Sequence, residues 1–255
     1  QSTLVSVTMT ANSGLPEVST PFAFLSNGAR GSTSGASVVG ALEAIKDLST
    51  NFIVPLFSVD AIEDIAAGET DSASTYTIDA INAAVKANVI SSSAVKARAN
   101  RQGFVSKQAS FADQQEAASD LASFRCSMSF LNVKNVSAAG TIVSYQPWMA
   151  AVIAAGAQAA AGYRGIVKKF ANITGLFHAH GSYNPRSYSQ KEAALKAGLL
   201  PLEPVNTGGF RFVSDQTTYT LDANFVFNSI QAVYVADLMT LSLVDAFDRV
   251  VVGQS

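Results

Sequence analysis

Several short segments of the chain carry the residue spacing of β-strands. The first alternates, with Val5, Val7 and Met9 on one side, which is typical of a strand with one buried face. The second, residues 52–57, is a continuous apolar run and predicts a strand covered on both faces. Pro55 within it indicates an edge position or a bulge. Further strands are predicted at residues 102–107, 125–133, 141–145, 164–168 and 210–213.

Helical spacing fills the intervals between most of these strands. Ser37 is predicted to cap one helix, and Ser110 with Asp113 has the form of a capping box that opens another, reaching residue 122. Two helices have clear apolar stripes, namely Val38, Leu42, Ile45 and Leu48, and Ile78, Ile81, Val85 and Val89. Shorter helices are predicted to begin at Asp60 and to span residues 189–197. Strands and helices therefore alternate through most of the chain.

A helix without charged residues lies near the middle of the sequence. Pro147 suits its first turn, and Gly162 is predicted to end it. Between them, residues 148–161 are almost all Ala, Val, Ile or Met, with Gln158 the only plainly polar side chain. A helix that is apolar all round is expected to be buried on every side. Together with the strands predicted before and after it, this helix predicts a β-α-β unit at the centre of the fold.

The C-terminal part is predicted to form one long helix, from Asp222 to about Val251. Its polar side carries Asp237, Asp245 and Asp248. Its apolar stripe is Val226, Ile230, Val233, Leu238, Leu241, Val244, Phe247 and Val251. Unbroken, this helix would be about 40 Å long at 1.5 Å per residue, which is longer than most small domains need. We therefore expect it to serve in contact with a partner.

The alternation of strands and helices predicts an α/β fold, with a mixed sheet flanked by helices on both faces. A smaller α+β portion, ending in the long helix, is expected to follow. We divide the chain into an N-terminal strand and loop (residues 1–36), an α/β core (residues 37–177) and the α+β portion (residues 178–255). With 255 residues, the chain is long enough to bury a full core.

Charge and composition narrow the class of function. The net charge is −2 and the pI about 5.7, so no basic surface for nucleic acid is predicted. Charged residues make up 14% of the chain against about 25% in typical domains, which suits a surface that is repeatedly buried against partners. A single cysteine excludes an internal disulfide, and no apolar run reaches the roughly 18 residues expected of a membrane span. The chain begins at Gln1 without the features of a signal peptide, so we expect a fragment or a processed product.

Two groups of residues have the outline of a ligand site. The segment Gly28–Gly35 is glycine-rich and precedes a helix, as a phosphate-binding loop does, but it lacks the Gly-Lys-Ser/Thr ending. A flexible surface loop is the favoured interpretation. His178 and His180 would lie on one side of a strand as a metal pair, yet no cysteine or carboxylate cluster lies nearby in sequence. Two partly exposed loop histidines are favoured there.

The remaining titratable residues have structural explanations. Asp60 follows a strand, where an α/β sheet often places ligand-binding residues, and Asp64 on the same helix could pair with it. Asp60 with Glu63 also forms a capping box, which we prefer. Cys126 is expected to be a packed apolar residue. Small basic groups at Lys96, Arg98 and Arg101, and at Lys168 and Lys169, are interpreted as solvated faces. We therefore predict no catalytic, cofactor-binding or metal-binding residue, and no enzyme activity.

The central stretch resembles the core of contractile-tail sheath proteins. In that family a proline, a helix of small residues and a Gly-aromatic-basic-Gly turn precede an Asn and a final Gly, and positions Tyr163, Gly165, Ala171, Asn172 and Gly175 match this layout. The stretch AGLLPLEPVNTGGFRFVSDQTTYTLDANFVFNSIQAV is similar to the downstream sheath order of helix, loop, two strands and long helix. The resemblance covers the chain from about Thr50 to its C-terminus.

This resemblance implies a structural subunit of a contractile tail sheath, of a phage or a related injection particle. Such subunits polymerise helically around a tail tube and contract to drive the tube through the host envelope, without a nucleotide. The implied partners are neighbouring sheath subunits, the tail tube protein, the baseplate and the tail terminator, with neither nucleic acid nor membrane insertion. The implied location is the phage tail of the virion, after assembly in the host cytoplasm.

Two other classes of function remain open from the sequence. One is a nucleotide- or metabolite-binding α/β enzyme domain that uses Gly28–Gly35 or Asp60, and the other is a scaffold or capsid-type assembly protein. The extended arm and final β-region of the sheath family do not follow the long helix in this sequence. We therefore expect the chain to be a monomer or small oligomer that does not build sleeves alone.

Overall fold

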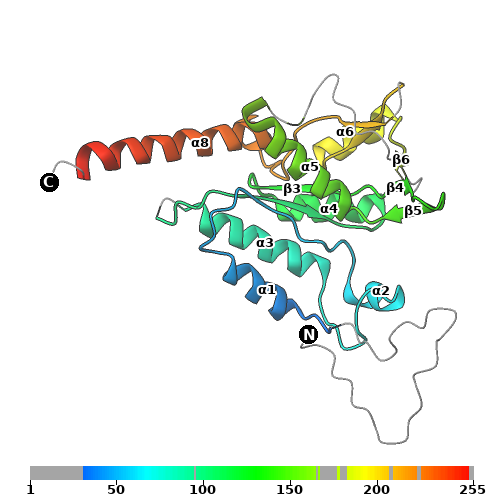
Figure 1. The fold of residues 1–255 in the computed structure, drawn as a ribbon. Coiled ribbons are helices and arrows are strands. Elements are labelled where there is room, and N and C mark those ends of the chain that lie inside the picture. Colours follow the sequence, from blue (N-terminus) through cyan, green and yellow to red (C-terminus); the bar gives the residue numbers. More distant parts are fainter. Residues whose placement is uncertain are drawn as a thin grey trace, which may run out of the picture.

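The computed structural model describes residues 31–94, 96–164, 166, 177–178, 183–206, 209–222 and 225–252 (Figure 1). The predicted strand with Val5, Val7 and Met9 lies outside these residues. The helices are α1 (Gly35–Ala44), α2 (Ala61–Ala66), α3 (Ile78–Ser92), α4 (Phe111–Leu121), α5 (Trp148–Ala161), α6 (Tyr188–Lys196), α7 (Phe225–Asn228) and α8 (Ile230–Phe247). The strands are β1 (Phe52–Ile53), β2 (Gln102–Ser106), β3 (Cys126–Ser129), β4 (Val133–Val136), β5 (Ile142–Tyr145), β6 (Phe177–His178), β7 (Leu202–Pro204) and β8 (Phe210–Phe212).

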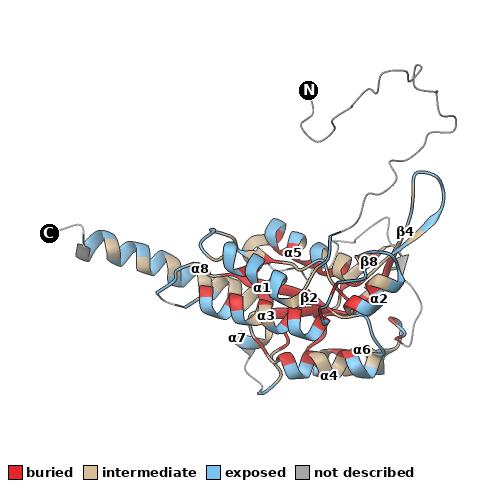
Figure 2. Ribbon diagram, turned by 90° about the horizontal axis from the view of Figure 1, so that it is seen from below, coloured by how far each residue is buried: buried red, intermediate tan, exposed pale blue. Residues whose placement is uncertain are grey.

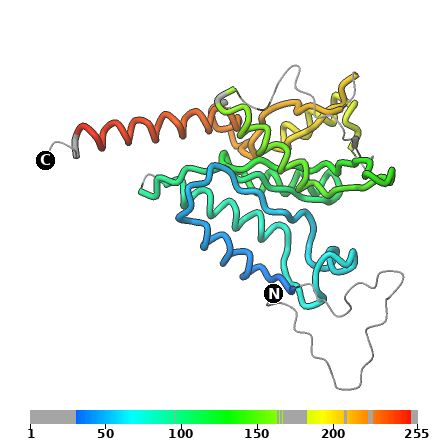
Figure 3. The backbone as a smooth tube through the Cα atoms, in the orientation of Figure 1, coloured from blue at the N-terminus to red at the C-terminus, as the bar shows by residue number. Residues whose placement is uncertain are grey.

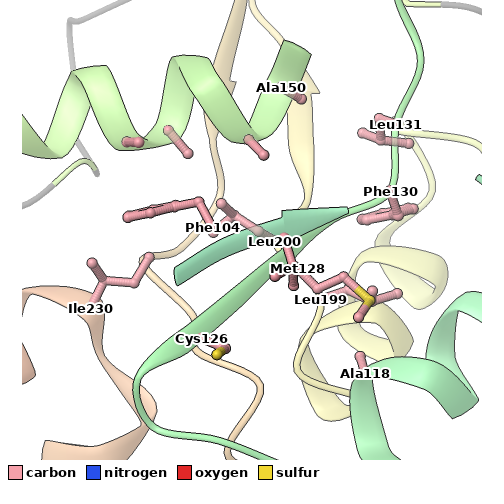
Figure 4. Close-up of a cluster of buried hydrophobic side chains, with 14 of the residues drawn as sticks. Phe104, Ala118, Cys126, Met128, Phe130, Leu131, Ala150, Leu199, Leu200 and Ile230 are labelled. Atoms are coloured by element: carbon pink, nitrogen blue, oxygen red, sulfur yellow. The ribbon is translucent and has the colours of Figure 1, made fainter. Parts of the chain in front are cut away.

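A parallel three-stranded sheet, in the order β1-β2-β3, forms the centre of the molecule. Every residue of β2 and β3 is buried, because α5 covers one face of the sheet while α3 and α4 cover the other (Figures 1 and 4). Phe104 lies between the sheet and α5, whereas Ala118 of α4 lies on the opposite side. The predicted α/β fold with helices on both faces is therefore confirmed.

The core is continuous from the first helix to the last. One cluster of buried apolar side chains extends from Leu42 of α1 to Ile230 of α8, and Figure 2 shows the buried residues concentrated around β2. Leu199 and Leu200, which follow α6, belong to the same cluster, and Leu200 donates its N–H to the carbonyl of Met128 at 2.9 Å. The division of the chain into three segments stays a prediction.

Two predicted strands are shorter than expected. β1 ends at Ile53, because Pro55 has no N–H for a ladder, and β1 occupies an edge of the sheet as the proline indicated. The single strand predicted over 125–133 is wrong. β3 ends at Ser129, and β4 begins at Val133 in a separate antiparallel sheet with the order β5-β4-β6.

The first strand of the predicted central β-α-β unit forms, but outside the central sheet, contrary to the prediction. β5 pairs antiparallel with β4 instead of joining the parallel sheet, and residues 162–164 form a 3-10 turn. Residues 165, 167 and 168 of the second predicted strand lie outside the described residues. The helix itself is confirmed, with Gly162 at φ 55° as its C-cap.

α5 is buried on one side only, contrary to the expectation of burial all round. Its inner side carries Ala150, Ala151, Ala154, Ala155, Gln158 and Ala161. The other side is exposed and consists of Val152, Gly156, Ala159 and Ala160, which we call the α5 outer face. The apolar character of this helix therefore exceeds what the described part of the chain buries.

The other predicted helices are confirmed with small shifts of their ends. α1 begins three residues earlier than predicted, because Ser34 and not Ser37 is its cap, and the Ser34 side chain accepts the Ser37 N–H at 3.1 Å. α4 begins after Ser110 as predicted, with the Ser110 side chain accepting the Asp113 N–H. α6 is capped by Ser187.

The predicted long C-terminal helix is broken at Ser229. This residue is extended and bridges Gln216, and its side chain caps α8 by accepting the Ala232 N–H. α7 and α8 are consequently separate helices. α8 has 18 residues, about 27 Å, and passes into a π-turn at Asp248–Val252. It leaves the body as a rod that ends near the C-terminus (Figure 3).

Replacing Gly103 by Ala tests how closely α3 approaches the sheet. A Cβ at this position would lie 2.8 Å from Cγ1 of Val85, so we expect the free energy of unfolding to fall by about 1–3 kcal/mol. Urea unfolding followed by circular dichroism measures this change. The control is Gly156→Ala, which meets no atom within 4 Å and should raise stability by about 0.5–1 kcal/mol. Equal effects of the two substitutions would contradict the packing described here.

Candidate assembly surface

The first half of α8 is fixed to the body by polar contacts. Gln102 at the start of β2 donates from Nε2 to the carbonyl of Ile230 at 3.0 Å. Arg125, just before β3, forms a two-pronged ion pair with Asp237, both N···O distances being 2.8 Å. Asn100 adds a bond of 3.1 Å to the same carboxylate. These contacts set the direction in which α8 leaves the body.

The side of α8 that faces the body is marked by a second ion pair, between Arg98 and Asp248. Asp237 and Asp248 are eleven residues apart, which corresponds to about 20° around a helix, so both carboxylates lie on one side. Leu241 and Val244 lie between them on that side and are half-buried. Two residues of the predicted polar side, Asp237 and Asp248, therefore lie on the inner side of α8, whereas Asp245 is exposed and pairs with Arg249 of the same helix.

The opposite side of α8 is apolar and exposed. Met239, Leu243, Phe247 and Val250 follow helical spacing and are 63%, 59%, 65% and 62% exposed. We call these four residues the α8 stripe. Of the apolar residues predicted for the contact face of this helix, only Ile230 and Val233 are buried within α8. The described part of the chain thus leaves a row of large apolar side chains in water.

Residues Ile230–Val250 are also long and apolar enough, by length and composition alone, to cross a membrane. This stretch of 21 residues joins α8 to the start of the π-turn, and its most apolar 18-residue part has a mean hydropathy of 1.4 and is 11% buried. Asp237, Asp245 and Asp248 interrupt the apolar sequence of this helix, so it contains no continuous apolar run of 18 residues. Asp237 and Asp248 are both paired with arginines of the body.

Two amides of the described part of the Gly28–Gly35 segment are bonded within the chain. Gly35 donates its N–H to the carbonyl of Thr75 at 3.0 Å, and Thr33 donates its N–H to Oγ of Ser74 at 2.9 Å. The Ser34 side chain caps α1. Residues 28–30 lie outside the described residues. The hydrogen bonds of Thr33 and Gly35 therefore join this loop to residues 74 and 75.

Asp60 has the capping role that the sequence predicts. The side chain of Glu63 accepts the Asp60 N–H at 3.0 Å, and Oδ1 of Asp60 accepts the N–H of Ile78 at 2.7 Å, so one residue joins the starts of α2 and α3. Asp64 does not pair with it. Asp64 is buried and accepts bonds from the hydroxyl of Tyr76 and, at 3.3 Å, from Nε2 of Gln146.

Burial and the adjoining carboxylate raise the pKa of Tyr76 well above its usual value. The Asp64–Tyr76 pair therefore holds the loop before α3 in place as a hydrogen-bonded unit. A cleft of about 720 Å³ opens beside this pair, lined by Tyr145 and Trp148 among other residues. Both oxygens of Asp64 are already engaged within the protein.

The interpretation of Arg101 as part of a solvated basic group is wrong. Arg101 is 1% exposed, and its guanidinium donates to the carbonyls of Ile45, Lys46 and Leu48 at 2.8–3.2 Å. These carbonyls follow the end of α1, where a cation is favourable. Burial lowers the pKa of Arg101. Lys96 is exposed as predicted, while Lys168 and Lys169 lie outside the described residues.

Cys126 is the packed residue that the sequence predicts. Its thiol is fully buried under α3 and the sheet, and burial raises its pKa to about 12, so it is not a thiolate at neutral pH. The backbone of His178 pairs with Val133 in β6, and His180 lies outside the described residues. Among residues that the structure describes, no group of three or more metal-binding side chains lies together.

Comparison with known families identifies the chain. Residues 31–218 match the family model described as the central domain of the phage tail sheath protein. The chain belongs to the phage tail sheath family. The resemblance drawn from the sequence is thereby confirmed, although Gly165, Ala171, Asn172 and Gly175, which carried part of it, lie outside the described residues. A comparison of the sheath chain with curated protein sequences gives no match.

Solved structures of sheath proteins share the fold of this sheath chain. A sheath tail protein of Desulfitobacterium hafniense is similar at a TM-score of 0.57 and 17% identity, covering 84% of this chain and 43% of that protein. A sheath tail protein of Listeria innocua has a TM-score of 0.55 and 14% identity, covering 84% of this chain and 41% of that protein. The helical sheath of the anti-feeding prophage in its contracted state has a TM-score of 0.52 and 15% identity, covering 85% of this chain and 52% of that protein. The chain thus spans less than half the length of the first two proteins.

Sequence reasoning missed the side chains that orient α8. Arg125 was placed only as the first residue of a strand, and Asp237 only on a polar helix face. The two are 112 positions apart, so their pairing follows from the fold and not from any local spacing. An acidic residue in an otherwise apolar helix was the one available indication of a fixed partner.

Removing the Asp237 carboxylate tests whether it fixes α8. The side chains of Arg125 and Asp237 are only 11% and 13% exposed, so Asp237→Asn should lower the free energy of unfolding by about 3 kcal/mol. The control is Asp248→Asn on the same helix, whose pair is 53% and 43% exposed and should contribute no more than about 1 kcal/mol. Urea unfolding measures both. A loss for Asp237→Asn no larger than that for the control would refute this role.

Proposed function

We propose that the chain is part of the structural subunit of a contractile tail sheath, which polymerises helically around a tail tube. The observation that carries this proposal is the family match over residues 31–218, together with the sheath fold of the described residues. Contraction of the assembled sheath then drives the tube through the host envelope. A relative of the same fold is the helical sheath of the anti-feeding prophage in its contracted state, which supports this proposal by analogy.

The surface of the chain suits mechanical work between copies. A helical sleeve needs contacts between two different patches of each subunit, since such contacts do not close on themselves. The α8 stripe and the α5 outer face are two exposed apolar patches on different parts of the molecule. The energy of contraction would come from the difference between two sets of such contacts, with no nucleotide consumed.

The proposed partners are neighbouring sheath subunits, the tail tube protein, the baseplate and the tail terminator. The proposed location is the phage tail of the virion, after assembly in the host cytoplasm. We also propose that the chain is no enzyme. In support of this, the candidate residues that the structure describes serve the fold: Asp60 caps helices, Asp64 binds Tyr76 and Arg101 binds backbone carbonyls.

Immunogold labelling of tailed particles tests the sheath assignment. Antibodies against the purified chain should decorate the outer sleeve along its whole length in negatively stained particles of the source organism. After contraction the label should occupy a shorter and wider sleeve, while the bare tube stays unlabelled. Label on the head or on free protein only, with none on the sleeve, would overturn the proposal.

Ligand-dependent melting tests the alternative of a nucleotide- or metabolite-binding enzyme. A ligand at a hundredfold excess over its dissociation constant would stabilise the chain by about 2.7 kcal/mol. Because the amides of Thr33 and Gly35 are already bonded within the chain, we expect no shift of the melting temperature with ATP, GTP or NAD and Mg²⁺. A saturable shift that Asp60→Asn abolishes would revive the alternative.

A further inference from the structure

We infer that the α8 stripe of one copy docks on the α5 outer face of a second copy, in a head-to-tail contact. This inference rests on the proposed function and names two surfaces that would carry part of it. The stripe presents Met239, Leu243, Phe247 and Val250, four large and exposed apolar side chains. The acceptor is a helix surface without a charged residue between 148 and 161.

The two surfaces match in length and in relief. The stripe runs from residue 239 to residue 250, a rise of about 17 Å, and α5 has 14 residues, about 21 Å. The α5 outer face is made of Val152, Gly156, Ala159 and Ala160, and a Cβ on Gly156 would meet no atom within 4 Å. Small residues leave room for the large side chains of the stripe, because they let two helices approach closely.

Contact between these surfaces within one copy is excluded by the direction of α8. Its distal half extends beyond the body, away from α5, in both ribbon views (Figures 1 and 2). The Arg125–Asp237 and Arg98–Asp248 pairs face α8 toward the body, so the stripe turns outward. The α8 stripe of one copy therefore binds the α5 outer face of a second copy. The stripe of the second copy then stays free to bind a third copy.

The area of the contact predicts a weak and repeatable association. Four side chains about 60% exposed contribute roughly 100 Å² each, about 400 Å² on the stripe and roughly 800 Å² with the facing surface. That is below the roughly 1,200 Å² of standard interfaces and matches transient ones. Each copy uses the contact twice, once as donor and once as acceptor, so chains of copies gain from repetition.

A lipid bilayer is a less suitable occupant than a second copy. The outward apolar part of α8 is about 17 Å long, whereas the hydrocarbon core of a bilayer is about 30 Å thick. The inner side of the same segment carries Asp237 and Asp248, both paired with arginines of the body. Insertion of α8 across a bilayer would have to break both pairs.

Blocking each surface separately tests the inference on the full 255-residue chain. Leu243→Glu blocks the stripe and Ala160→Glu blocks the α5 outer face, and both positions are exposed, so folding should persist. By analytical ultracentrifugation the unaltered chain should associate weakly, into small head-to-tail oligomers whose mean size rises with its concentration. Each variant alone should associate at least about tenfold more weakly. An equal mixture of the two variants should form a dimer that grows no further, because one intact contact remains between them.

The matched control is Ser242→Glu, which adds the same charge to α8 off the stripe and should leave association unchanged. A chain that stays monomeric at several hundred micromolar would overturn the inference. Continued association of Ala160→Glu alone would also overturn it, since stripe-to-stripe pairing would then be the contact. Stripe-dependent binding to phosphatidylglycerol vesicles without self-association would assign α8 to a membrane. In each of these cases labelled sleeves would still uphold the proposed function, so the two failures are distinguishable.

Discussion

The complete burial of β2 is the constraint on which the rest of the structure depends. Its five residues are shielded by β1 and β3 at the edges and by helices on both faces. Gly103 allows α3 to approach the sheet, because any larger residue would meet Val85. Alanines on the inner side of α5 do the same on the other face. A glycine on the strand and alanines on α5 thus let the helices cover a sheet of three short strands closely on both faces.

The start of β2 also joins parts of the chain that are far apart in sequence. Arg101 holds the carbonyls that follow α1, and Gln102 holds the first carbonyl of α8. Neither residue is satisfied by water, since they are 1% and 4% exposed. Buried polar groups are costly without partners, so these hydrogen bonds fix the end of α1 and the start of α8 relative to the sheet.

Local sequence patterns predicted the elements well where a short-range cause decides them. The caps at Asp60 and Ser110 and the stop at Gly162 follow from one or two residues each. Sheet membership was predicted poorly, because β5 carries the same apolar spacing whether it joins the parallel sheet or pairs with β4. The break at Ser229 likewise depends on a bridge to Gln216, which helical periodicity cannot reveal.

The candidate surfaces were predicted only in part. An uncharged helix and a long amphipathic one were evident from the sequence, and few charges overall indicated contact with partners. Which side of each helix is free was not evident. Arg125 and Arg98 hold Asp237 and Asp248 on the inner side of α8, while the α8 stripe lies on the opposite side, so a row of large apolar residues faces water there.

The small side chains of the α5 outer face affect how a partner helix could move along it, as well as how it could bind. Val152, Gly156 and Ala159 recur at nearly one-turn intervals, with no protruding side chain and no charge among them. A helix lying along such a surface meets almost the same relief after a shift of one turn, about 5.4 Å. Ratchet-like shifts of this size are known between packed elements. A helix packed on the α5 outer face could therefore occupy more than one position along it, one turn apart, at similar energy.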